Sequence, residues 1–301
     1  MTLAVEGAQL GATLTAPAGR VRGGLVPLHP AAYASRRQFL FDHLAELLPA
    51  HGVAVLRFDR RPAPAGDDVP FALQAADALA ALETLRAEPE IGEAPLGLWA
   101  WSQGAWAAPL AAAWSVEVGF LVLVAGAGVS PAEQMRYGTA EQLRRAGYGA
   151  EALSELAELR SACERVLRGD GGLAEAQTTI DRFAERPWFS LAYLPRTIPP
   201  EARWTDIDFD PEPVFEQVRC PVLLFYGEHD EWTPIDATLA AWSRAGAVSA
   251  NDAVRVVRLA GADHAPTIGG RLEASAISPA YEQALLGWLD EILPSGRRAV
   301  G

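Results

Sequence analysis

The sequence contains no lysine, so all 25 of its basic residues are arginine. Against these stand 38 acidic residues, which gives a formal net charge of −13 at pH 7. A surface that binds nucleic acid requires clustered cations. The arginines stand together only in pairs, such as Arg36-Arg37 and Arg60-Arg61, and a pair is too small for such a surface. We therefore expect no nucleic-acid partner.

Cysteine and long hydrophobic runs are also scarce. Two cysteines, Cys163 and Cys220, are too few for a disulfide framework, and neither belongs to a Cys-x-x-Cys pair. No His, Asp or Glu cluster has metal-ligand spacing, so we expect neither a metal nor another cofactor. The apolar stretches are broken before they reach a membrane-spanning length, and residues 1–24 lack a signal-peptide pattern. These absences favour a cytoplasmic protein with no membrane partner.

Half of the 301 residues are hydrophobic, which is enough for one large core. Short runs rich in Val and Leu alternate with segments of helical length after an expected antiparallel hairpin over residues 3–15. Strands that are apolar throughout require a sheet covered on both faces, and their alternation with helices implies mostly parallel pairing. The expected strands are 25–28, 53–58, 96–100, 120–124, 222–226 and 254–259. The expected helices are 36–48, 71–86, 105–114, 237–244 and 281–293.

The helix expected over residues 71–86 has an apolar stripe at helical spacing. The stripe consists of Leu73, Ala76, Leu79, Ala80, Leu82 and Leu85.

One segment interrupts the alternation of strands and helices. From residue 131 to 213 there is no convincing buried strand, while 132–146 and 151–167 have amphipathic helical patterns. An aromatic and proline-rich stretch follows, through Trp204. Because this segment comes after the strand at 120–124, it is predicted to form a helical lid above the strand ends. The α/β core would then consist of residues 1–130 and 214–301.

Ser102 lies in the stretch Trp101-Ser102-Gln103-Gly104, between an apolar strand and a helix-forming segment. A sharp turn between strand and helix lifts a serine side chain above the sheet and directs helix N-terminal amides toward a reacting oxygen. Small residues two before and two after the serine allow this turn to close. Here they are Ala100 and Gly104, so alanine stands where such turns usually have glycine.

Asp230 and His264 follow strands in the same way. Asp230 lies just after the strand at 222–226, and His264 just after the strand at 254–259. Ligand sites of open α/β sheets lie at the carboxyl ends of the strands. We therefore expect Ser102, Asp230 and His264 to meet there as nucleophile, acid and base. Several neighbouring carboxylates are less favoured as the acid: Glu228, Glu231, Asp236 and Asp263.

These stretches, together with residues 55–61 and 227–230, resemble the α/β-hydrolase superfamily over nearly the whole chain. The sequence is most similar to bacterial serine hydrolases of the acyl-peptidase and thioesterase-like kind. Their triads follow the chain order Ser, Asp, His, as this sequence does. The resemblance implies an α/β-hydrolase fold and hydrolysis through an acyl-enzyme formed on Ser102, with His264 as base and Asp230 orienting the imidazole.

Stabilisation of a developing oxyanion requires two backbone donors. The first is expected to be the amide of Gln103, at the start of the helix after the nucleophile. The second should come from the loop that follows the strand at 25–28, where related enzymes commonly have His-Gly. This chain has His29-Pro30, and because Pro30 carries no amide hydrogen, the expected donor is Ala31. His29 is interpreted as structural.

Aromatic residues near a catalytic serine often form an apolar binding wall. Trp101, Tyr33, Trp188 and Trp232 are the expected substrate contacts. Since no cations cluster around them, a neutral, partly hydrophobic ester, thioester or amide is favoured. Acyl transfer, cyclisation or amide cleavage with the same triad, and a non-catalytic small-molecule receptor, remain as alternatives. The only expected partner is a small acyl substrate, and the sequence does not indicate the oligomeric state.

Overall fold

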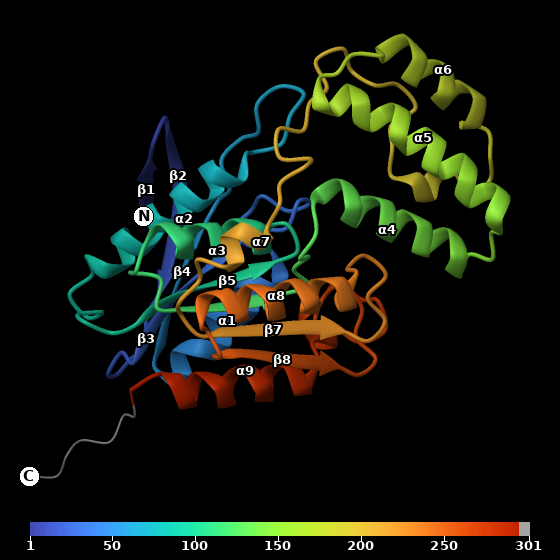
Figure 1. The fold of residues 1–301 in the computed structure, drawn as a ribbon. Coiled ribbons are helices and arrows are strands. Elements are labelled where there is room, and N and C mark those ends of the chain that lie inside the picture. Colours follow the sequence, from blue (N-terminus) through green and yellow to red (C-terminus); the bar gives the residue numbers. More distant parts are fainter. Residues whose placement is uncertain (295–301) are drawn as a thin grey trace, which may run out of the picture.

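The computed structural model describes residues 1–294 and is built around an eight-stranded sheet (Figure 1). Its strand order is β1-β2-β4-β3-β5-β6-β7-β8. The first two strands, β1 (Thr2–Val5) and β2 (Ala8–Thr15), form the antiparallel hairpin expected at the start of the chain. Residues 295–301, which the expected range 214–301 includes, lie outside the described residues.

The remaining strands are parallel to one another, which confirms the fold class predicted from the apolar runs. Four of the six are buried along their whole length, as a sheet covered on both faces requires. At one edge of the sheet β8 is partly exposed. The six strands are β3 (Gly23–Leu28), β4 (Val53–Phe58), β5 (Leu96–Trp101), β6 (Phe120–Val124), β7 (Val222–Gly227) and β8 (Val254–Leu259).

Helices pack on both faces of this sheet. On one face lie α2 (Phe71–Arg86), α3 (Gly104–Trp114) and α8 (Ile235–Ser249), and the short α7 (Glu212–Phe215) contacts α3 and α8. On the other face lie α1 (Phe39–Leu47) and α9 (Pro279–Ile292). Two hydrophobic clusters therefore sandwich the sheet. Residues 1–294 also contain three short 3-10 helices: Leu48–His51, Phe189–Ala192 and Ala274–Ala276.

The bounds of α2 agree with the prediction, but its buried face does not. The helix buries Ala75, Ala78 and Ala81 together with Leu82 and Leu85. The other four members of the predicted stripe are only half-buried. Small alanines allow α2 to approach its neighbours closely, and its contacts with α3 are extensive.

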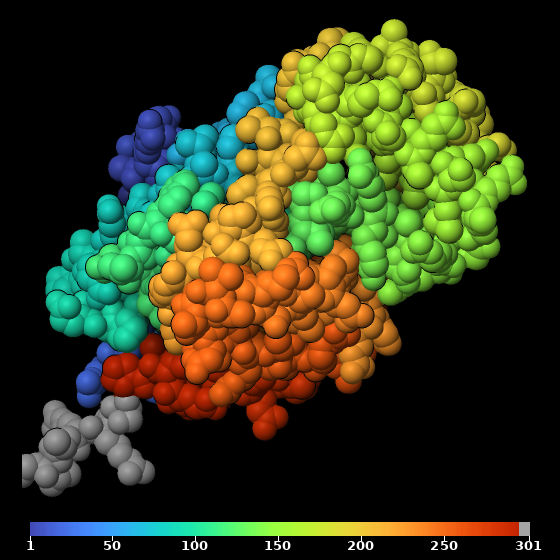
Figure 2. All heavy atoms as spheres, viewed as in Figure 1, coloured from blue at the N-terminus to red at the C-terminus, as the bar shows by residue number. Residues whose placement is uncertain are grey.

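Between β6 and β7 the chain forms the helical segment, residues 131–213. Its three main helices are α4 (Pro131–Arg145), α5 (Ala150–Arg168) and α6 (Leu173–Phe183). A capping box between Ser130 and Glu133 fixes the start of α4. These helices enclose their own hydrophobic cluster, which includes Leu159 and Ile180. In Figure 2 they form the yellow-green lobe at the upper right.

The helical segment returns to the core beside the loop that precedes α2. The Arg203 amide donates to the Gly66 carbonyl at 2.6 Å. The Thr205 hydroxyl donates to Asp67 at 2.5 Å, and its amide donates to the same carboxylate at 3.1 Å. Asp206 accepts from the Phe71 amide at 2.6 Å. The loop of residues 59–70 is therefore the main polar attachment of the returning chain.

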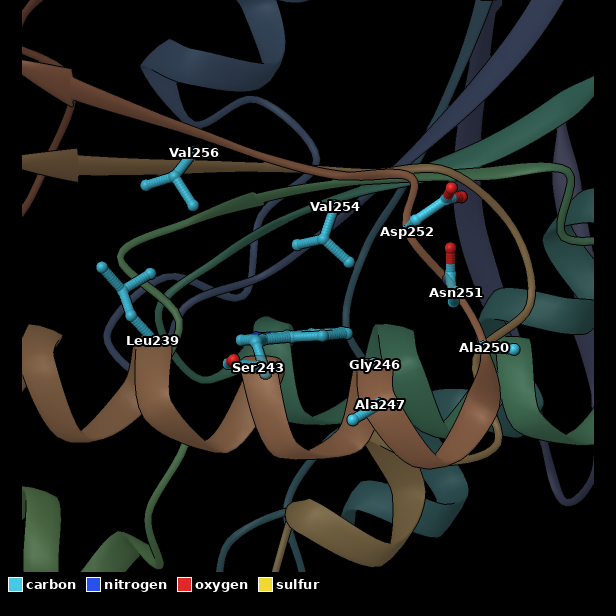
Figure 3. A pocket seen from close by; sticks show the side chains of 10 residues that line it. Leu239, Ser243, Gly246, Ala247, Ala250, Asn251, Asp252, Val254 and Val256 are labelled. Atoms are coloured by element: carbon cyan, nitrogen blue, oxygen red, sulfur yellow. The ribbon is translucent and has the colours of Figure 1, made fainter.

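An open hollow of about 570 Å³ lies between α8 and the edge strand β8 (Figure 3). Leu239, Val254 and Val256 face it, and Asn251 and Asp252 lie at one end. It extends to the amino end of β8, whereas His264 follows the carboxyl end. This hollow is separate from the strand ends at which the predicted site residues meet.

Candidate active site

Ser102 occupies a strained turn between β5 and α3. Its φ is +54°, a left-handed backbone conformation that is costly for a residue other than glycine. The turn is held by the Ser102 amide, which donates to the Val124 carbonyl at 2.9 Å, and by the Ser102 carbonyl, which accepts from the Ala105 amide at 2.9 Å. Strain at a nucleophile keeps its hydroxyl exposed above the sheet.

The two small residues beside the turn have different surroundings. A Cβ atom on Gly104 would lie 2.9 Å from the His29 carbonyl oxygen and 3.0 Å from Leu28. Glycine is therefore required there by the close approach of α3 to the end of β3. Ala100, which stands where glycine is usual, is fully buried in β5 opposite Leu28. Its methyl group is part of the hydrophobic core, which accommodates the departure from the motif.

The structure brings Ser102, His264 and Asp230 together in a hydrogen-bonded chain. His264 Nε2 lies 2.8 Å from Ser102 Oγ. On the other side of the ring, His264 Nδ1 lies 3.0 Å and 3.1 Å from the two Asp230 carboxylate oxygens. The three residues come from the turns after β5, β7 and β8, where the sequence placed them.

The electrostatics of this chain favour one arrangement of protons. Burial raises the pKa of Asp230, but the charge and hydrogen bond of His264 and donors from the Thr233 and Trp232 residues outweigh it and lower the pKa overall. Burial lowers the pKa of His264, but the charge and hydrogen bond of Asp230 outweigh it and raise the pKa overall. Asp230 is therefore ionised and accepts from Nδ1–H, which leaves Nε2 to accept from the serine.

The other carboxylates near the turn after β7 have different partners or positions. Glu231 pairs with Arg145 of α4 at 3.4 Å. Asp236 lies in the first turn of α8, and Glu228 is exposed. The turn itself approaches the His264 loop closely, since the His229 amide donates to the Ala262 carbonyl at 2.9 Å. Of these side chains, Asp230 is the one that reaches the imidazole.

The two expected oxyanion donors have free amides. Within residues 1–294, neither the Gln103 amide nor the Ala31 amide donates a hydrogen bond to a backbone carbonyl in a turn, loop or helix cap. Gln103 is the N-cap of α3, where backbone N–H groups are left without a helical partner. Ala31 is exposed, in the turn after β3. The backbone therefore offers these two donors beside the nucleophile turn and at the end of β3.

One predicted aromatic residue, Trp101, borders the imidazole, and a second, Tyr33, stacks on Trp101. The Trp101 indole N–H donates to the His264 carbonyl at 2.9 Å, and its ring centroid lies 6.3 Å from the imidazole. The Tyr33 ring stacks on Trp101 at 6.1 Å and is 38% exposed. An aromatic surface open to solvent therefore adjoins the base.

Trp232 and Trp188 differ in their placement. Trp232 follows the acid, is half-buried, and meets Tyr193 edge to face at 4.7 Å. Trp188 is buried in the cluster of the helical segment, where it lies against Phe183 and its indole N–H donates to Glu155. The structure therefore does not bring Trp188 to the triad, because its ring fills the interior of the helical segment.

His29 is buried between the rings of Phe41 and Phe58. Burial and the charge of Arg60 lower its pKa to about 3. A neutral imidazole packed between aromatic rings agrees with a structural role.

Sequence reasoning missed a polar link behind the free amides. The side-chain amide of Gln103 donates to Asp68, and Asp68 also pairs with Arg60. Arg60 belongs to the stretch that carried the family resemblance, but no spacing rule connects it with Asp68 or Gln103. Their proximity arises from the path of the loop that leaves β4.

Two further properties concern metals and membranes. In the part of the chain that the structure describes, no group of three or more His, Cys, Asp or Glu side chains is arranged to hold a metal ion. None of the helices in residues 1–294 combines the length and the hydropathy needed to span a bilayer.

Comparisons with known proteins agree on the fold. The sequence pattern of the alpha/beta hydrolase family matches residues 25–271. No curated protein sequence matches the chain significantly. Among solved structures, a proline iminopeptidase from Mycobacterium smegmatis has a TM-score of 0.61 at 17% identity, over 97% of this chain and 98% of that one.

Two further solved structures span most of the chain. An esterase from Pyrococcus furiosus has a TM-score of 0.59 at 15% identity, over 98% of this chain and 90% of that one. A dienelactone hydrolase from Anabaena variabilis has a TM-score of 0.55 at 18% identity, over 98% and 97%. At these identities the likeness establishes a shared fold, not a shared substrate.

Proposed function

Because the chain belongs to the alpha/beta hydrolase family and is a hydrolase, we propose that it cleaves a carboxylic ester, thioester or related acyl bond through a Ser102–His264–Asp230 triad. One observation carries the proposal. The Ser102 hydroxyl, the imidazole and a buried carboxylate form a continuous chain of hydrogen bonds at 2.8 Å and 3.0 Å. A receptor has no need of this combination, which supports catalysis over the alternative of a non-catalytic binder.

In the first half of the reaction, Ser102 Oγ attacks the acyl carbonyl carbon while His264 Nε2 takes the hydroxyl proton. The carbonyl oxygen becomes an oxyanion and accepts hydrogen bonds from the Gln103 and Ala31 amides. The bond to the leaving group then breaks, and the imidazolium returns its proton to that group. The acyl group remains on Ser102 as an ester.

In the second half, water attacks the acyl-enzyme while His264 takes one of its protons. The second tetrahedral intermediate expels Ser102 Oγ, which regains a proton from the imidazolium. Throughout, Asp230 stays ionised, holds the ring by Nδ1 and stabilises its charged form. The free carboxylic acid leaves, and the resting hydrogen-bonded chain is restored.

We propose a small, neutral and partly hydrophobic substrate. Support comes from Trp101, whose ring borders the imidazole, from Tyr33, which stacks on Trp101, and from Trp232, which follows Asp230 in the chain. The nearby guanidinium groups already have partners, since Arg60 pairs with Asp68 and Arg145 with Glu231. A large anionic group would therefore find no unpaired cation among these residues.

We also propose that the helical segment acts as a lid. Its first helix, α4, lies against the acid turn, where Arg145 donates to the His229 carbonyl at 2.8 Å. A Cβ atom on Gly138 would collide with the Trp232 ring, so α4 packs closely on the residue two after the acid. A covering helix beside the triad would exclude bulk water from the acyl group.

A fluorophosphonate probe with mass-spectrometric location of the adduct tests the triad. We expect phosphonylation of Ser102 that disappears in His264→Ala, because the hydroxyl then has no base. The matched control is His229→Ala, an exposed histidine that does not contact Ser102, and it should label like the wild type. Absence of labelling in folded protein would contradict the proposal. p-Nitrophenyl esters of increasing acyl length then address the substrate.

A further inference from the structure

Behind the proposed oxyanion donors, a single carboxylate joins the two parts of the chain that carry them. Asp68 accepts from the Gln103 side-chain amide with one oxygen and from the Arg60 guanidinium with the other. The Arg60 side chain is 7% exposed and the Asp68 side chain 29% exposed, so the pair is partly shielded from solvent. Arg60 and Asp68 play no part in the mechanism described above.

Arg60 also holds the loop that contains Ala31. Its guanidinium Nη1 lies 3.4 Å from the Pro30 carbonyl oxygen and 3.4 Å from the Ala31 carbonyl oxygen. Its backbone amide donates to the Ala34 carbonyl at 2.8 Å. The same arginine therefore contacts the loop at three carbonyl groups.

The contact with the Pro30 carbonyl has a direct consequence for the donor. In a trans peptide the carbonyl oxygen and the amide hydrogen point in opposite directions, and the structure has no cis peptide in the described residues. The guanidinium lies 3.4 Å from the Pro30 oxygen, which also accepts from the Tyr33 amide at 3.4 Å, and together these two contacts set the direction of the Ala31 N–H. The guanidinium also polarises that peptide, which strengthens the N–H as a donor.

We infer that Arg60 and Asp68 are positioning residues of the oxyanion hole, which hold the Ala31 and Gln103 amides at a fixed separation through the link Arg60–Asp68–Gln103. This inference rests on the proposed function, since it assigns a role within the same site. The link gives the loop three contacts with Arg60 although Pro30 contributes no amide hydrogen. Preorganised donors stabilise the transition state without reorganising during the reaction.

The test compares Asp68→Ala with Asp77→Asn. Asp77 is buried and pairs with Arg61, the neighbour of Arg60, but it contacts neither Gln103 nor the Ala31 loop. Removal of a whole oxyanion donor lowers kcat by about 10²–10³-fold. We expect Asp68→Ala, which loosens donors without removing them, to lower kcat by about 10–100-fold with KM little changed. Asp77→Asn should affect the melting temperature and leave kcat unchanged.

Three further measurements separate positioning from general stability. A trifluoromethyl ketone forms a hemiketal with Ser102 whose oxygen occupies the oxyanion hole, so its affinity should fall in parallel with kcat in Asp68→Ala. Gln103→Ala keeps the backbone amide and removes the link, so its effect should not add to that of Asp68→Ala. Arg60→Lys should also lower kcat, because an ammonium cannot bridge the carbonyls and Asp68 as a guanidinium does.

Fluorophosphonate labelling of the wild type is measured first, because it distinguishes failure of the proposed function from failure of this inference. A folded wild type that is not labelled overturns the proposed function, and this inference with it. A wild type that is labelled, together with an Asp68→Ala variant that keeps its kcat and ketone affinity, overturns the inference alone. Equal losses in Asp68→Ala and Asp77→Asn would do the same.

Discussion

At the scale of single residues, the environment of His264 determines the pH at which the proposed triad would operate. Asp230 lies within hydrogen-bond distance of Nδ1, and its charge raises the pKa of His264 against the effect of burial. The imidazole must be neutral to take the proton of Ser102. We therefore expect activity to be absent at low pH and to appear as the imidazole loses its proton.

The first prediction concerns the pH profile. We expect kcat/KM to rise with pH through a midpoint above 6.5, the ordinary histidine value, because the folded pKa is raised. Asp230→Asn removes the charge that raises the pKa of His264, while burial, which lowers this pKa, remains. The midpoint should therefore move to lower pH. The same change should lower kcat by about 10⁴-fold, because the imidazole loses its orienting acceptor.

Asp263→Asn is the control for this profile. Asp263 is the residue before His264, yet it is not among the groups that shift the histidine. Its removal should leave the midpoint in place. A wild-type midpoint below 6.5, or an equal displacement in both variants, would contradict the assignment of Asp230 as the partner.

The residues of the proposed triad could be predicted because each follows an apolar strand, and parallel strands align their carboxyl ends. Trp188 was misplaced because a tryptophan in a proline-rich stretch gives no sign of which surface it faces. Arg60 and Asp68 were not found, since their contacts depend on the path of a loop. The place of a residue after a strand can be recognised from the neighbouring sequence, whereas a contact between two loops cannot.

At the scale of elements, the approach of α3 to β3 determines the geometry of the nucleophile turn. Gly104→Ala would place a methyl group 2.9 Å from the His29 carbonyl oxygen, and the backbone there cannot give way easily. We expect a destabilisation of about 1–3 kcal/mol in urea unfolding, as for other overpacked sites. Labelling of Ser102 should slow as well, because the turn moves with the helix.

Gly287→Ala in α9 is the matched comparison. A Cβ atom there meets nothing within 4 Å, and the residue lies inside a helix. Removing this glycine should stabilise the protein by about 0.5–1 kcal/mol, since alanine loses less backbone entropy on folding. If both substitutions changed the free energy of unfolding in the same direction, close packing at Gly104 would not be the cause of the destabilisation.

The strands were predictable to within a residue or two, because burial on both faces leaves the central strands β3, β5, β6 and β7 almost entirely apolar. The buried faces of the helices and the residues at which they end were less predictable. In α2 three of the eight buried positions are alanine and two are polar, and alanine is so frequent in this chain that it marks no particular face. The start of α6 follows Gly171-Gly172, and its 11 residues form a short pattern that the sequence did not separate from the surrounding loop.

At the scale of the whole molecule, the protein has a sheet-centred core and a second hydrophobic cluster in the helical segment. Ile180 is fully buried in the second cluster. We expect Ile180→Ala to cost about 2–5 kcal/mol of local stability. Hydrogen exchange should rise in α5 and α6 while peptides from β5 to β7 keep their protection.

Val122→Ala is the counterpart within the core, since Val122 is fully buried in β6. It should lower the protection of the sheet and of the helical segment together, because the segment is tethered to the core. Loss of protection across the whole protein in Ile180→Ala would show that the two clusters unfold as one unit.

The consecutive carboxylates Asp67 and Asp68 give the loop before α2 two attachments. Asp67 accepts from Thr205 of the returning chain, and Asp68 accepts from Arg60 and Gln103. These two neighbouring residues therefore connect the chain that returns from the proposed lid with the side chains that hold the proposed oxyanion donors. If the proposed lid moved to admit substrate, the loop would move with it and the Gln103 and Ala31 amides would lose their fixed positions. The enzyme would then be inactive while it is open.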